Sequence, residues 1–363
     1  MKLLDKYLFT QVFQSFLFGL ALLIIVWIAP ELIPKVVRDV VADNITAYNG
    51  FLTILYELPE VIVKSLPMAM LIGALLAFDR MSKDSEITAM RSCGISIYRM
   101  LGSILLLGIA GTIIAFIINE TIVPPTSLAQ EKIINKGRLI SQNFTFVDKD
   151  KKDILKQVIL IENFDGSTIN NIRIINFNSL SPASQNIKEI IAASTGKWAK
   201  DHWELSKGIA FRITSGGYYE DTIYFDNEKV FSNPNAYTLL SKSQKKAKNM
   251  NLFELKNYIN ALVNSHHSEE ARYYKVRLHQ KFSQPFAVII LGIVGVILGL
   301  HPPRSSRFVG YTVGMFVILT YYFLWPLTIA LGNIGALPPL IAAWLPNVVA
   351  TLIGLLILKY KVF

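Results

Sequence analysis

A run of ten residues, RYYKVRLHQK, places five basic side chains directly before an apolar segment that ends at Leu300. On a helix these side chains gather on two neighbouring faces, where they can bind the phosphates or carboxylates of a lipid head group. Long basic side chains also extend to a membrane interface, but that alternative explains one or two cations rather than five. Lys35 and Arg38, one helical turn apart after the first apolar segment, indicate the same chemistry. The residues of the run are Arg272, Lys275, Arg277, His279 and Lys281.

Charged residues also lie inside an apolar segment. Glu57, Glu60 and Lys64 share one helical face within the second segment. A charge inside a bilayer costs roughly 2.5–3.5 kcal/mol, so such residues face a protein interior or a water-filled cavity. Two interpretations stay open, an ion pair between Glu60 and Lys64 or a face that borders a polar path. Glu120, at the end of the third apolar segment, is a candidate for the same path.

The loop from Asp79 to Arg99 predicts a short helix at about residues 84–93. Ser82 or Asp84 is expected to cap its start, and Gly94 to supply the left-handed residue that ends it. The helix would project charge beside a small apolar edge, which favours a docking surface for a soluble partner over a simple connector. The charged residues concerned are Asp84, Glu86 and Arg91.

Composition identifies the class of protein that must position these residues. The chain has 363 residues, of which 52% are hydrophobic and 17% charged, with a mean hydropathy of +0.40. Soluble domains carry about 25% charged residues, so this chain is an integral membrane protein with a sizeable polar part. The net charge of +10 does not indicate a nucleic-acid partner, because the basic residues flank apolar segments.

Other chemistries find little support in the sequence. The single Cys93 excludes an intrachain disulfide, and His202, His266, His267 and His301 have no companions with metal-ligand spacing. The chain contains no G-x-x-x-x-G-K-[ST] motif, and we find no nucleophile–base pattern. We therefore predict no catalytic residues, no metal and no cofactor.

Six apolar segments are long enough to cross a bilayer. Lys and Arg of the short loops divide ten to two between the two sides, so both termini are expected in the cytoplasm. Gly295 with Gly299, and Gly310 with Gly314, form GxxxG pairs that favour internal helix packing, with contact to a partner subunit as the alternative. The six segments run from about 7 to 29, 51 to 78, 101 to 123, 272 to 300, 309 to 331 and 337 to 358.

The region between the third and fourth segments predicts a β domain outside the cytoplasm. The runs QVILIE, NIRIINF, FRIT and DTIYFD are typical of strands, and Asp165-Gly166 and Ser215-Gly216-Gly217 of turns, as in a sandwich or jelly roll. Asn251 is expected to cap an amphipathic helix that leads into the fourth segment. The predicted fold is an α-helical membrane protein with six transmembrane helices and an inserted periplasmic all-β, jellyroll-like domain. Its parts are residues 1–123, 124–250 and 251–363.

Two stretches of the chain match a known family. The segments ELPEVIVKSLPMAMLIGALLAFDRMSKDSEITAMRSCGIS (57–96) and VRLHQKFSQPFAVIILGIVGVILGL (276–300), with the order of three spans, β domain and three spans, resemble the lipopolysaccharide-export permeases of the LptF/LptG type. The similarity covers essentially the whole chain and is weakest in the β domain.

This resemblance implies a function and a set of partners. A second LptF/LptG-type permease, or a copy of this chain, would pair with it, and an LptB-like cytoplasmic ATPase dimer would dock on a coupling helix at residues 84–93. Glu86 falls where the family has an acidic coupling residue, and Lys35 and Arg38 where basic residues contact lipid phosphates. The lipid would enter between the first span of one subunit and the fifth of its partner, then pass through the β domain to LptC/LptA-like bridge proteins.

The function expected on these grounds is that of a permease subunit of an ABC-type transporter in the bacterial inner membrane. It would extract lipopolysaccharide, or a similar anionic glycolipid, from the outer leaflet, powered by ATP hydrolysis in a separate subunit rather than by an enzymatic activity of its own. Two alternatives stay open. One is a mechanotransmitting subunit that relays ATP hydrolysis without moving lipid, and the other is a membrane-embedded enzyme that acts on a lipid head group.

Overall fold

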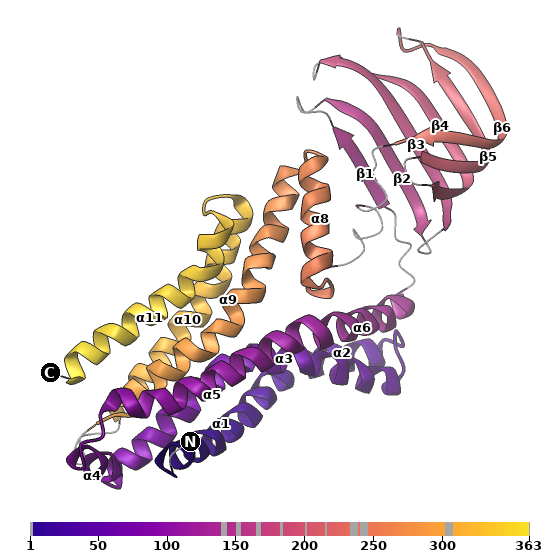
Figure 1. Ribbon diagram of the computed structural model, residues 1–363. Helices are drawn as coiled ribbons and strands as arrows, with labels where there is room; N and C mark the ends of the chain where they lie inside the picture. The colour runs from indigo at the N-terminus through magenta and orange to yellow at the C-terminus, as the bar shows by residue number, and fades with distance from the viewer. Residues whose placement is uncertain are drawn as a thin grey trace. The chain divides into compact units, whose positions relative to one another are not determined.

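The chain forms two compact units, which are described separately. One unit comprises Met1–Gly137 with Lys275–Phe363, and the other comprises Arg138–Tyr274 (Figure 1). The computed structural model describes residues 3–138, 144–149, 154–164, 168–181, 184–199, 202–214, 216–232, 239, 246–301 and 308–362.

The first unit is a helical bundle. Within the described residues, six helices are long and apolar enough to cross a membrane, as the sequence predicted. Two of them are continued by a single wide π-helical turn into a further helix. The elements are α1 (Leu3–Trp27), η1 (Ile28–Leu32), α2 (Ile33–Val41), α3 (Ala47–Lys83), α4 (Glu86–Ser92), α5 (Ile97–Ile117), η2 (Ile118–Ile122), α6 (Val123–Arg138), α9 (Ser268–Gly299), α10 (Phe308–Ile334) and α11 (Pro339–Val362).

The two π-turns have the same local cause. The N–H of Ile33 bonds to the carbonyl of Ile28, and that of Val123 to the carbonyl of Ile118, each one residue before a proline. Proline lacks an N–H and its ring clashes with the carbonyl four residues earlier, so a wider turn lets the helix continue past it. The first and third spans therefore extend beyond the ends that hydropathy predicted.

Helices α3 and α9 form the centre of the bundle. Most of the apolar stretch of each is buried, whereas most of that in α1, α5, α10 and α11 is not covered by the chain. Glycines allow the close approach, because a Cβ on Gly295 would lie 2.4 Å from the carbonyl oxygen of Leu71 and one on Gly299 would lie 2.7 Å from the Cβ of Phe78. A Cβ on Gly314 of α10 would lie 2.9 Å from Cδ1 of Leu75 in α3. Both GxxxG pairs thus contribute to internal packing, as the sequence favoured.

We expect Gly295→Ala to lower the stability of the bundle by about 1–3 kcal/mol, because the new methyl group meets a backbone carbonyl that cannot rotate away. Gly102→Ala in α5 is the matched control, since no atom lies within 4 Å of its added Cβ. Alanine in that open helical position should be neutral or stabilising. Thermal unfolding of the two purified variants in detergent measures the difference, and equal midpoints would contradict the packing assignment.

The second unit contains an antiparallel sheet of six described strands. The strands pair in the order β1-β2-β3-β4-β5-β6, so each follows its neighbour as in a meander. An all-β domain inserted between the helices is therefore confirmed, and the four predicted strand runs lie in β2, β3, β5 and β6. The predicted Asp165-Gly166 turn lies outside the described residues, whereas Gly217 has the positive φ of 82° that suits a turn. The strands are β1 (Phe144–Lys149), β2 (Leu155–Phe164), β3 (Thr168–Ser181), β4 (Ser184–Ala199), β5 (His202–Ile213) and β6 (Tyr219–Phe231).

The sheet bends along one row of residues. Asn171 in β3 and Lys207 in β5 both have a φ of 54°, a left-handed conformation that interrupts the alternation of side chains. Ile169 and Ile172 are three residues apart, yet both are fully buried on the same apolar face. The interruption therefore curves the strands without turning their apolar side chains outward.

A short amphipathic helix, α8 (Leu252–Asn264), follows the sheet in the second unit. The side chain of Asn251 accepts a hydrogen bond of 2.8 Å from the N–H of Glu254, so the predicted cap is confirmed. Leu255, Tyr258 and Leu262 form its buried face. The imidazole of His267 then lies 2.7 Å from the carbonyl oxygen of Val147, which fastens this part of the chain to β1.

Candidate functional site

The short helix α4 follows the end of α3 after only two residues. Its first residue, Glu86, accepts a hydrogen bond of 2.8 Å from the hydroxyl of Tyr7 in α1. Gly94 ends the segment with a φ of 82°, as predicted. The expected cap is wrong, because Ser85 occupies the capping position without a side-chain bond. Ser82 instead donates to the carbonyl of Gly299 over 3.0 Å.

Asp84 and Arg91, the other two charged residues predicted for docking, are exposed to solvent. Asp84 is exposed and lies 3.8 Å from Arg80, a distance typical of a weak surface ion pair. Arg91 is exposed on α4, whereas Ile87 is buried against the bundle. The loop therefore offers charge to its surroundings while its apolar side anchors it to the other helices.

A partly buried polar cluster lies beside this loop, and the sequence did not reveal it. The carboxylate of Asp79 in α3 lies 2.7 Å from Nε2 of His301 and accepts a hydrogen bond of 2.8 Å from the hydroxyl of Tyr311 in α10. From the sequence, His301 was considered only as a metal ligand, and its contact with Asp79 was not predicted. A signal was present, since Asp79 is a carboxylate directly after the apolar stretch MAMLIGALLAF of α3.

At the far end of the spans from α4, Lys281 turns inward. Its ammonium lies 2.5 Å from a carboxylate oxygen of Glu120 in η2, and the side chains are 8% and 14% exposed. From the sequence, Lys281 was assigned to the basic binding cluster and Glu120 to the polar path. The structure instead joins the two residues in an ion pair. In low-dielectric surroundings such a pair is retained only with good geometry.

The remaining basic residues of α9 do not form one continuous face. Lys275 is exposed, whereas Arg272, Arg277 and His279 are half-buried. The guanidinium of Arg277 donates to the side-chain oxygen of Gln280 over 2.9 Å. The cations available to a ligand in this conformation are thus fewer than the five of the run.

Lys35 and Arg38 are both exposed on α2, on either side of the buried Val36. Because the π-turn continues α1 into α2, both residues stand on a regular helix one turn apart, as their spacing predicted. Both side chains are therefore accessible to a ligand in this conformation.

Within α3, Lys64 lies 2.7 Å from Glu60, so the ion pair is present. Glu57 is half-buried on the same helix. The backbone carbonyl of Lys64 also accepts a hydrogen bond of 2.6 Å from the hydroxyl of Tyr322 in α10. The cavity beside the lysine measures about 10 Å³, which holds at most one water, so any polar path here is closed in this conformation.

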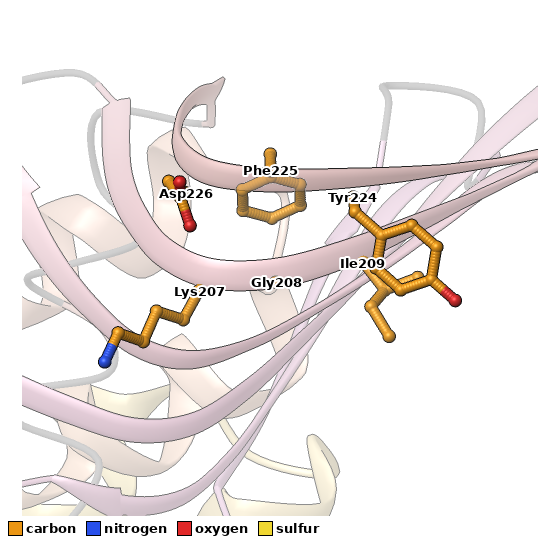
Figure 2. A pocket seen from close by; sticks show the side chains of 6 residues that line it. All are labelled: Lys207, Gly208, Ile209, Tyr224, Phe225 and Asp226. Atoms are coloured by element: carbon orange, nitrogen blue, oxygen red, sulfur yellow. The ribbon is translucent and has the colours of Figure 1, made fainter.

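The β domain carries two grooves that the sequence did not predict. One, of about 360 Å³, lies along β5 and β6 (Figure 2). There Gly208 makes room for the ring of Phe225 on the adjacent strand, because a Cβ at this glycine would collide with it. The other groove measures about 690 Å³ and includes Lys197, Glu204 and Glu228. The pKa of the Glu228 carboxyl is raised, mainly by its burial and, to a smaller degree, by the negative charge of Glu189.

Comparison with known proteins assigns the whole chain to one group. Residues 6–360 match the family described as lipopolysaccharide export system permease LptF/LptG. The chain is 23% identical to the permease protein LptG of Escherichia coli (strain K12) over 382 residues, which covers 99% of this chain and 98% of the relative. It is 21% identical to LptF of the same strain over 351 residues, 95% of this chain and 91% of the relative. LptF of Shigella flexneri is similar to the same degree.

Proposed function

Because the chain belongs to the LptF/LptG family of lipopolysaccharide export permeases, we propose that it is a permease subunit of an ABC-type transporter. In this role it extracts lipopolysaccharide, or a similar anionic glycolipid, from the outer leaflet of the inner membrane. A separate ATPase provides the energy, and a periplasmic bridge receives the lipid. The family and the six apolar helices indicate a multi-pass protein of the inner membrane.

The observation that carries the proposal is the division of charged groups between the two ends of one bundle. One end holds α4, with Glu86 bonded to the first span and Arg91 exposed. The opposite end holds the exposed cations Lys35 and Arg38 and the buried pair of Lys281 with Glu120. A docking surface at one end and anion ligands at the other suit a transporter whose energy source and substrate lie on opposite sides.

We assign the α4 end to the cytoplasm, with both termini on that side and the β domain in the periplasm. The excess of Lys and Arg in the short loops at that end supports this orientation. It places Lys35, Arg38 and Lys275 where the phosphates of an outer-leaflet lipid would lie.

The same orientation defines the partners. An LptB-like ATPase dimer docks on α4, and LptC/LptA-like proteins continue the route from the β domain. A second LptF/LptG-type permease, or a second copy of this chain, covers the open apolar faces of α1 and α10. Between the first span of one subunit and the fifth span of the other, these faces provide the lateral opening through which lipid enters.

The carboxylates considered for a head-group enzyme do not come together in one site in the described part of the chain. That activity requires a convergent acid–base or metal set at one membrane depth. Among the described residues, Glu60 and Glu120 instead lie in ion pairs with two different lysines, Lys64 and Lys281. A mechanotransmitting subunit would also use α4 to contact an ATPase. A measurement of lipid movement distinguishes it from a permease.

The decisive experiment reconstitutes the chain with its partner permease and ATPase in proteoliposomes that contain lipopolysaccharide. ATP should drive lipopolysaccharide from the vesicles to a soluble periplasmic acceptor, while a non-hydrolysable ATP analogue should not. Mass spectrometry of the released lipid should show an unaltered head group. ATP hydrolysis without release would instead identify a mechanotransmitter, and a chemically modified head group would identify an enzyme.

A further inference from the structure

The polar cluster at the α4 end joins three helices at one carboxylate. The Asp79 carboxylate lies 2.7 Å from Nε2 of His301 and accepts a hydrogen bond of 2.8 Å from the hydroxyl of Tyr311. Asp79 belongs to α3, His301 follows the end of α9 by two residues, and Tyr311 lies in the first turn of α10. Asp79 is only 7% exposed, whereas Tyr311 is 38% exposed, so the carboxylate end of both bonds lies in surroundings that strengthen them.

The backbone holds α9 against α3 at the same place. A Cβ on Gly299 would lie 3.0 Å from the backbone nitrogen of Asp79, so the last turn of α9 lies directly on α3. One turn further along α3, Ser82 donates to the carbonyl of Gly299, and its side chain is buried. The end of α3 is thus fastened to the end of α9 on both sides of Asp79.

The position of this cluster relates it to α4. Only Asp84 and Ser85 separate the last residue of α3 from the first residue of α4. A displacement of α4 must therefore move the end of α3. Apolar contacts allow helices to slide past one another, whereas hydrogen bonds to a buried carboxylate are directional and resist sliding.

We propose that Asp79, His301 and Tyr311 form a clamp that passes displacements of α4 to α9 and α10. These three side chains are positioning residues, because they act through the helices that they join. The clamp moves the C-terminal helices together with α3, so that force applied at α4 reaches both halves of the bundle. The inference rests on the proposed function, in which an ATPase acts on α4.

The test compares variants of the full chain in the reconstituted transporter, in vesicles that contain lipopolysaccharide. His301→Gln and Tyr311→Phe should each lower the lipid released per ATP hydrolysed by about threefold or more, the effect expected of residues within a coupling network. Binding of the ATPase should be unchanged. Tyr48→Phe is the matched control, because it removes a hydroxyl from an exposed tyrosine at the start of α3, outside the loop with α4, and should leave the ratio unchanged.

The ratio separates coupling from a purely structural role. A variant that only folds poorly lowers release and ATP hydrolysis in proportion, which leaves the ratio as it was. The double variant His301→Gln/Tyr311→Phe should uncouple little more than the stronger single variant, because both bonds share the Asp79 carboxylate. An unchanged ratio in both single variants would overturn the clamp.

A second readout does not depend on lipid release. Spin labels on Thr88→Cys in α4 and Met315→Cys in α10, in a Cys93→Ser background, report the distance between the two exposed positions. With the clamp intact, α4 and α10 move together, so ATP should leave this distance unchanged. In His301→Gln/Tyr311→Phe, ATP should shift or broaden it. If the distance responds to ATP equally with and without the clamp residues, the clamp is refuted, even where failed lipid release has already refuted the proposed function.

Discussion

Glu120→Gln should destabilise the chain by about 3–5 kcal/mol, the cost of leaving one partner of a buried ion pair without its counter-charge. The side chain of Lys281 is 8% exposed, and its ammonium lies 2.5 Å from the carboxylate that this change neutralises. Glu31→Gln is the matched control, because Glu31 is the acid of the other π-turn and is exposed. It should change stability by less than about 0.5 kcal/mol. Thermal unfolding in detergent compares the two variants.

A compensating variant tests whether the charge itself is responsible. Lys281→Met combined with Glu120→Gln removes both charges and keeps an unbranched side chain of similar length in α9. Replacing a buried pair in this way is often neutral, so most of the lost stability should return. A double variant as unstable as Glu120→Gln would contradict the ion-pair explanation.

The same double variant separates structure from transport. If Lys281 contacts lipid phosphates once the pair opens, the stable double variant should still release lipopolysaccharide more slowly than the wild type. The pair would then hold Lys281 with an internal anion until the lipid arrives. Release at the wild-type rate would assign Lys281 to stability alone and leave Lys35, Arg38 and Lys275 as the accessible cations.

Glu86→Lys should lower ATP-driven lipid release by roughly 30-fold or more. Loss of one partner of a buried interfacial charge pair costs about 2–5 kcal/mol, and reversal of the charge adds repulsion. The resemblance to the family assigns Glu86 to the contact with the ATPase, which is the interface that would be lost. Co-purification of the ATPase with the variant and release from proteoliposomes measure the two consequences.

Tyr7→Phe distinguishes two roles of the Glu86 carboxylate, its hydrogen bond to α1 and its contact with the ATPase. It removes the hydrogen bond to Glu86 inside the chain and leaves the charge for a partner. A single hydrogen bond to a charged group contributes about 1.5–3 kcal/mol, and here one donor is partly exposed, so the effect on release should be smaller than that of Glu86→Lys. If Tyr7→Phe lowers release as strongly as Glu86→Lys, the Glu86 carboxylate serves the packing of α1 rather than coupling.

Apart from the cap of α4, most features that depend on neighbours along the chain were predicted correctly. The six spans follow from length and hydropathy, the end of the α4 segment follows from Gly94, and the start of α8 follows from Asn251. Each is decided within a few residues by solvation, by the freedom of glycine or by a local hydrogen bond. The ion pair of Glu60 and Lys64 belongs to the same class, since one helical turn separates its members.

What the sequence by itself determined is therefore the set of elements, their order and the kinds of charge at each end of the bundle. The tertiary structure decided the partners, because Lys281 and Glu120 are 161 residues apart and His301 and Asp79 are 222 apart, far beyond any helical spacing. It also decided which side of α9 faces inward, since that depends on the close approach of α3 at its glycines. Long-range packing selects which of several chemically suitable partners a buried charge meets, and no local pattern contains that choice.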